Sequence, residues 1–115
     1  MDSAESKRLF AASISEAAFQ GTIENALGVS GHLWAHFRPA RTQAGWRTAM
    51  SGHPGFPDLI AISRDGHLKV AEVKTVRGIV RPEQHRWLDA FSQAGAWAEI
   101  LRPGDEDAFR GFISA

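Results

Sequence analysis

The sequence has no cysteine among its 115 residues, which excludes a disulfide scaffold, a thiol nucleophile and any cysteine-ligated zinc or iron–sulfur site. It also has no net charge, since 13 Lys and Arg balance 13 Asp and Glu, and this argues against a binder driven by cationic excess. No apolar run is long enough for a membrane span and no signal-peptide pattern opens the chain. We therefore expect a soluble, cytoplasmic protein with no membrane partner.

What is present is typical of a globular chain, with 43% hydrophobic and 23% charged residues. No internal repeat or Pro/Gly/Ser-rich linker divides the chain, so we expect a single domain over 1–115, with 1–12 as a flexible or helical extension. The charges are unevenly distributed, because residues 25–86 hold nine Lys and Arg against four Asp and Glu. This distribution predicts a basic middle segment suited to a phosphate-bearing partner, between acidic flanks.

Periodicity and boundary residues predict an α/β protein. A helix over 13–28 begins at a capping box from Ser13 to Glu16, and it places Glu16 among the apolar residues Phe19, Ile23 and Leu27. A carboxylate there is costly unless it is paired or bound to a metal, although Glu16 can also serve only as a helix cap. The other predicted elements are strands at 32–38, 58–63, 67–74 and 96–102, a long loop at 39–57, a helix that begins at Pro82 and ends before Gly95, and a short helix that Asp105 caps and that ends at Phe112.

The strands at 58–63 and 67–74 form the clearest local signal, a hairpin closed by Arg64-Asp65-Gly66. With this three-residue loop, the numbers of paired residues sum to 130, so Asp58 lies opposite Glu72. Because side chains alternate along a strand, Glu72 and Lys74 share one face. Two carboxylates and an ammonium group thus converge on one patch of sheet.

This group of residues has a chemical interpretation and a plain structural one. Two such carboxylates can hold a hard cation such as Mg²⁺, which polarises a phosphate and lowers the pKa of an attacking water. Lys74 can orient that water or offset charge on phosphorus. In the structural interpretation, Asp58 only begins a strand, and Glu72 and Lys74 form a surface ladder. Glu16, Gln84 and the basic, glycine-bearing loop before Asp58 favour the chemical interpretation.

The motifs resemble those of the VRR-NUC domain of the PD-(D/E)XK nuclease superfamily, in its small stand-alone phage and bacterial form. The resemblance is carried by Gly55-Phe56-Pro57-Asp58, Glu72-Val73-Lys74, Gln84 to Leu88 and Ala94-Gly95, with the Ser15 to Gln20 and His36 to Pro39 segments. It implies a restriction-endonuclease-like core, a central mixed sheet flanked by helices, in the order α-β-β-β-α-β with a short C-terminal helix.

The resemblance also implies roles for residues. Asp58, Glu72 and the Val73 carbonyl bind Mg²⁺ or Mn²⁺, Lys74 assists the attacking water, and Glu16 helps to hold the metal. Gln84 has a positioning role near the active site. The implied activity is that of a Mg²⁺-dependent deoxyribonuclease, a homodimer selective for branched DNA or four-way junctions, in a bacterial or phage-infected cell. A catalytically silent nucleic-acid-binding domain and a ribonuclease remain as alternatives.

Several further residues are candidates for DNA contact, each with solvation as the alternative: Arg38, Arg41, Arg47, His53, Arg77 and Arg81. Trp46 is predicted to stack on a base or to pack across a dimer. Trp87 is predicted to lie in the core with Leu88 and Phe91. His32 and His36 are expected at the surface or in a groove rather than as metal ligands, and His85 is expected to be structural or exposed.

Overall fold

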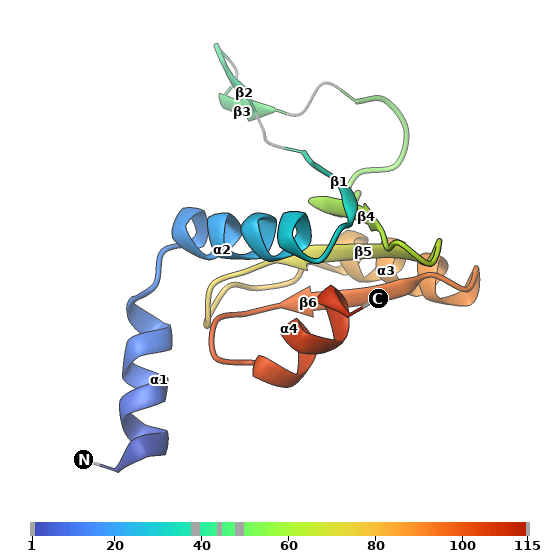
Figure 1. Ribbon diagram of the computed structural model, residues 1–115. Coiled ribbons are helices and arrows are strands. Elements are labelled where there is room, and N and C mark those ends of the chain that lie inside the picture. The colour runs from blue at the N-terminus through green and yellow to red at the C-terminus, as the bar shows by residue number, and fades with distance from the viewer. Residues whose placement is uncertain (1, 38–39, 44, 48–49, 115) are drawn as a thin grey trace.

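A four-stranded mixed sheet forms the centre of the protein, with helices on both of its faces (Figure 1). The computed structural model describes residues 2–37, 40–43, 45–47 and 50–114, and describes only the backbone within 40–42 and 45–47. The strand order is β1-β4-β5-β6, where β1, β4 and β5 are antiparallel and β6 runs parallel to β5. These strands are β1 (Leu33–His36), β4 (Leu59–Ile62), β5 (Leu68–Val73) and β6 (Trp97–Leu101).

The helices divide between the two faces of the sheet. α2 (Glu16–Val29) and α4 (Glu106–Ile113) cover one face, and α3 (Pro82–Gln93) packs against β5 and β6 on the other. α1 (Ser3–Ser13) extends away from the sheet (Figure 1). The predicted α/β architecture is confirmed and the predicted elements occur in the expected order, with α1 added in front and two short strands added between β1 and β4. Among the described residues, no helix has the length and hydrophobicity needed to cross a bilayer.

The hydrophobic core lies between the sheet and the α2–α4 layer. Phe19, Ile23 and Leu27 of α2 are buried there, as their helical spacing predicts. They pack against Phe112 of α4 and against the inward side chains of β4, β5 and β6: Leu59, Ala61, Ala71, Val73 and Leu101. Because these strand residues alternate with outward ones, Glu72 faces the opposite layer, where α3 lies.

The β4–β5 hairpin has the predicted register. Leu59 pairs with Ala71 and Ile62 with Leu68, so the numbers of paired residues sum to 130. The turn closes with the Gly66 amide donating to the Ser63 carbonyl (2.9 Å), and Gly66 adopts a positive φ of 83°. The hairpin therefore brings Asp58 and Glu72 to the same end of adjacent strands.

The predicted start of the first core helix is wrong by three residues. Ser13 ends α1, and its hydroxyl donates to the Phe10 carbonyl (2.6 Å), so it cannot cap the next helix. The N-cap of α2 is Ser15, whose hydroxyl oxygen accepts from the Ala18 amide (3.1 Å). Glu16 is consequently the first residue of α2 and is exposed, one turn before the buried face begins at Phe19.

The expectation that His32 and His36 lie at the surface or in a groove is also wrong. His32 is buried beside Lys69 of β5, with 3.2 Å between His32 Nε2 and Lys69 Nζ. His36 Nδ1 lies 2.8 Å from Glu24 Oε2 on α2. The buried Lys69 ammonium also donates to the Phe112 carbonyl (2.7 Å), which ties the end of α4 to β5. Each imidazole is thus in contact with a residue distant in the sequence.

The segment predicted as a long loop contains a second, two-stranded sheet. β2 (Ala40–Thr42) and β3 (Gly45–Arg47) pair with each other, and their hairpin stands off from the central sheet (Figure 1). Arg38 and the side chains of Arg41, Trp46 and Arg47 lie outside the described residues. Their predicted contacts with DNA or with a second subunit therefore stay predictions.

Candidate active site

Asp58 and Glu72 lie close together where β4 begins and β5 ends, next to the first turn of α3. Asp58 immediately precedes β4, and its Oδ2 accepts a hydrogen bond from the Val73 amide (3.0 Å). The Asp58 carbonyl accepts from the Phe37 amide (2.7 Å) at the end of β1. Two backbone contacts thus fix the position of this carboxylate beside Glu72.

Glu72 is fully buried, and its two carboxylate oxygens differ in their surroundings. Oε2 accepts a hydrogen bond from Gln84 Nε2 (3.2 Å), whereas Oε1 has no hydrogen-bond partner among the described residues. Burial, followed by the adjacent Asp58 carboxyl, raises the pKa of Glu72 to about 8 against the opposing effect of Lys74 and Arg81. The carboxyl is therefore unfavourable in its charged form unless a further cation neutralises it.

This donor set fits a divalent cation. The residues that could bind one are Asp58 and Glu72, both oxygen donors, and the unpartnered Glu72 Oε1 is the ligand atom that the protein leaves unused. Within the described ranges, no three His, Asp or Glu side chains cluster closely enough to hold a metal. The protein therefore provides two carboxylates, which leaves coordination positions for water and phosphate.

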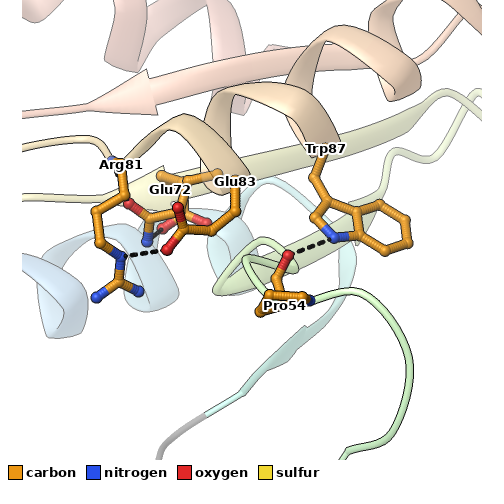
Figure 2. Close-up of polar contacts among 6 residues, drawn as sticks. Pro54, Glu72, Arg81, Glu83 and Trp87 are labelled. Atoms are coloured by element: carbon orange, nitrogen blue, oxygen red, sulfur yellow. Dashed lines mark hydrogen bonds and ion pairs between the residues drawn. The ribbon is translucent and has the colours of Figure 1, made fainter.

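The first turn of α3 orients Glu72. Gln84 is buried, and its Oε1 accepts from the Arg81 amide (2.9 Å) while its Nε2 donates to Glu72. Pro82 occupies the first helical position, as predicted, and needs no hydrogen-bond acceptor there. The exposed Arg81 side chain, which acts electrostatically on Glu72, forms an ion pair with the partly exposed Glu83 (3.0 Å), drawn in Figure 2. Gln84 thus joins the start of a helix to the carboxylate.

Lys74 follows β5 directly and is held by its backbone. Its amide donates to the Leu101 carbonyl (2.9 Å), which continues the β5–β6 ladder by one residue. Arg102, at the end of β6, then fixes the following turn, because its Nη1 donates to the carbonyls of Thr75 (2.8 Å) and Gly78 (2.6 Å). The sequence contains no signal for this role of Arg102, since the contacts join segments 24 and 27 residues apart.

The other predicted site residues are more dispersed. Glu16 is exposed at the start of α2 and does not join Asp58 and Glu72 in a three-acid cluster in the described part of the chain. Arg77 and His85 are exposed, and His53 lies exposed in the loop that precedes Asp58. The structure therefore brings together Asp58, Glu72, Lys74, Gln84 and Arg81, and leaves Glu16 apart from them.

Trp87 supports the loop before Asp58 and is only half-buried, so its prediction as a core residue is wrong. Its indole Nε1 donates to the Pro54 carbonyl (3.0 Å), a contact drawn in Figure 2, and lies 3.3 Å from the His53 carbonyl. Gly55 completes the attachment, since its positive φ of 91° lets the loop lie directly on the backbone of Glu83. The indole and Gly55 thus fix the loop onto α3.

We expect Gly55→Ala to be strongly destabilising. A Cβ at Gly55 would lie 2.6 Å from the Glu83 carbonyl carbon and oxygen, so the loop or the first turn of α3 must move. Gly52→Ala is the matched control, because Gly52 also has a positive φ (102°) but open space around a Cβ. Thermal unfolding should show a loss of about 1–2 kcal/mol for Gly52→Ala and a loss of about 3 kcal/mol or more for Gly55→Ala. Equal losses would contradict the contact.

The fold and the site together define a class of protein. In PD-(D/E)XK nuclease folds, an acid precedes one strand of a hairpin and lies opposite a Glu-x-Lys motif at the end of the next strand. The hairpin belongs to a mixed sheet flanked by helices. Asp58, Glu72 and Lys74 have this arrangement here. The family model described as the VRR-NUC domain matches residues 12–103, and the chain belongs to this family. Membership implies a nuclease-type fold.

A solved structure supports the same assignment. A chain described as "VRR_NUC domain" is similar to this protein with a TM-score of 0.65 and 21% sequence identity, over 85% of this chain and 92% of that one. At this identity the similarity demonstrates the fold. The search of curated proteins found no match to this chain.

Proposed function

We propose that this protein is a nuclease that requires Mg²⁺ or Mn²⁺ and hydrolyses phosphodiester bonds of DNA at the Asp58–Glu72 site. The observation that supports the proposal most strongly is the fully buried Glu72 carboxylate next to the half-buried Asp58, with Glu72 Oε1 unpartnered among the described residues and Lys74 nearby. Burying Glu72 beside a second acid is unfavourable for folding, and a domain that only binds nucleic acid has no use for that arrangement. Membership of the VRR-NUC family supports the same activity.

The side chains have separable roles in this proposal. Asp58, Glu72 and the Val73 carbonyl would hold the cation, which when bound polarises the phosphate and lowers the pKa of the attacking water. Lys74 orients that water and offsets negative charge that grows on the phosphoryl oxygens. Gln84 keeps Glu72 directed toward Asp58 through its 3.2 Å hydrogen bond. Glu16 begins α2, which packs on the other face of the sheet from Glu72, so it is not included among the metal ligands.

The proposed substrate is branched DNA, including flaps and four-way junctions. Arg81 acts electrostatically on Glu72 and is exposed, so it would contact a phosphate of the bound strand, and exposed Arg77 is proposed as a further phosphate contact. The ion pair between Arg81 and Glu83 does not prevent this, because surface ion pairs contribute little and exchange readily. Several cationic contacts of this kind make binding weaker as salt rises.

We also propose that the protein acts as a homodimer. Leu33, Ile62 and Leu68 are cross-strand neighbours on β1, β4 and β5, and all three are exposed apolar side chains on one side of the sheet. Such a contiguous patch is suited to a second copy of the chain, and two sites permit paired cuts in a junction. Light scattering at micromolar concentration should give twice the 12.6 kDa mass of one chain. A monomer would contradict the dimer and leave the nuclease site in place.

The test is a cleavage assay on end-labelled linear duplex, flap and four-way-junction DNA, with an RNA strand of the same sequence. We expect cleavage of DNA with Mg²⁺ or Mn²⁺, none in EDTA, 5′-phosphate products and faster cutting of the branched substrates. Cleavage of RNA alone would identify a ribonuclease. Binding of DNA without cleavage under every metal condition would identify a silent binding domain.

A further inference from the structure

A cavity of about 420 Å³ opens directly beside the carboxylate pair. Asp58 and Gln84 form one of its walls, and the loop from Gly52 to Pro57 forms another. The roles proposed for the two carboxylates and Lys74 do not involve the rest of this cavity. A nucleic acid strand that places a phosphate at Asp58 must, however, place the adjoining nucleotide at the mouth of the cavity.

The walls away from Asp58 are mainly apolar and aromatic. Phe37 and Phe56 meet edge to face, with ring centroids 5.6 Å apart, and Met50 adds a flexible thioether side chain. Phe37 is 41% exposed and Met50 53% exposed, so both present apolar surface to whatever enters. Cationic groups occur as Arg81 and, when protonated, His53. Flat aromatic walls with a cation nearby suit a nucleobase and its phosphate.

Packing and hydrogen bonding hold the loop wall of the cavity in place. Phe56 lies at the centre of an aromatic cluster, 5.0 Å from Trp87 and 5.9 Å from Phe91 between ring centroids. The indole of Trp87 and the close packing of Gly55 on α3 hold the same loop. Binding therefore does not require the wall to order itself first, which lowers the entropic cost of binding.

We propose that this cavity receives an unpaired nucleobase next to the scissile phosphate. This inference rests on the proposed nuclease function and specifies its substrate class: strands whose nucleotide beside the cut is unpaired, as in a single strand, a flap or a branch point. A base inside a continuous duplex must first leave the stack, which costs binding energy and disfavours linear duplex. Because the walls offer stacking surfaces more than hydrogen-bonding groups, the cavity accepts all four bases.

The test measures affinity for flap DNA in EDTA by fluorescence anisotropy, so that no cleavage step intervenes. The test compares a series of flaps, in each of which one nucleotide near the branch is replaced by an abasic nucleotide. We expect one position at which removal of the base weakens binding by roughly 5- to 150-fold, the value of one stacked base. Phe37→Ala should abolish most of this difference, so that it binds the intact and abasic flaps alike.

Phe10→Ala is the matched control, because Phe10 is a 71% exposed phenylalanine on α1, outside the cavity. It should keep the full preference for the intact base. Met50→Ala provides a second cavity variant on an exposed loop, in case Phe37→Ala melts at a lower temperature than wild type. The proposal is overturned if abasic sites are neutral at every position, or if Phe37→Ala and Met50→Ala both retain the wild-type preference.

The two proposals fail separately. Metal-dependent cleavage together with indifference to abasic sites would retain the nuclease and remove the base pocket. Base-dependent binding that Phe37→Ala abolishes, without any cleavage, would remove the nuclease and retain the pocket.

Discussion

Lys74→Ala should lower the rate of DNA cleavage by roughly 10²–10³-fold or more and leave the fold intact. The reason for the large effect is that the ammonium group acts on charge that develops only in the transition state. The fold survives because Lys74 is positioned by its backbone, whose amide bonds to Leu101, and by Arg102 beyond it. Single-turnover cleavage of flap DNA measures the rate, and thermal unfolding checks the fold.

Arg77→Ala is the control for loss of positive charge alone. Arg77 is exposed three residues further along, so its removal should weaken DNA binding and reduce the salt dependence without lowering the single-turnover rate at saturating protein. If Lys74→Ala behaves like Arg77→Ala, Lys74 contributes to binding and not to the chemical step. Cleavage by Lys74→Ala at the wild-type rate would contradict its assignment.

Glu72→Gln should stabilise the metal-free protein while it abolishes cleavage. The buried carboxyl has an unpartnered Oε1 and a pKa raised from 4.5 to about 8 by burial and by Asp58. A glutamine carries no charge there, keeps the acceptor for Gln84 and can donate an N–H to Asp58. We expect the unfolding temperature in EDTA to rise by roughly 4–8 °C, which corresponds to about 1 kcal/mol.

The effect has a defined pH dependence. Because the pKa of Glu72 is higher in the folded state, the unfolded chain releases this proton first, and the metal-free wild type loses stability as pH rises from 4.5 toward 8. The advantage of Glu72→Gln over wild type should therefore grow across this range. Glu83→Gln, which changes a partly exposed acid one residue from Gln84, should show no such trend.

Added Mn²⁺ tests whether Glu72 is buried as a metal ligand or as a structural group. Wild type should gain stability with Mn²⁺, since a ligand that binds only the folded state raises its unfolding temperature. Glu72→Gln should gain little, and Glu83→Gln should respond like wild type. If Glu72→Gln melts below wild type in EDTA, or gains as much from Mn²⁺, the carboxylate is a structural group and not a metal ligand.

The part of the site that could be predicted is the part that is local in sequence. Arg64-Asp65-Gly66 defines the hairpin turn, and the turn sets the register that brings Asp58 to Glu72. Pro82 and Gln84 likewise follow from rules for the first turn of a helix, which depend on neighbouring residues.

The part that could not be predicted depends on contacts distant in sequence. His32, which precedes β1, is buried in contact with Lys69 of β5, and no periodicity reveals that pair. Glu16 is exposed because the preceding helix α1 ends at Ser13 and moves the start of α2 to Glu16. The cavity beside Asp58 depends on Phe37 from β1's end meeting Phe56 from the loop, two residues with no shared motif.

One comparison tests the central claim most directly: cleavage of flap DNA by wild type and by Asp58→Ala, purified in parallel, in Mg²⁺ and in EDTA. Loss of Asp58 removes one of the two carboxylates and the acceptor of the Val73 amide. We predict cleavage by wild type in Mg²⁺ only, and none by Asp58→Ala in either condition. Equal cleavage by Asp58→Ala, or cleavage by wild type in EDTA, would contradict a metal-dependent site at Asp58 and Glu72.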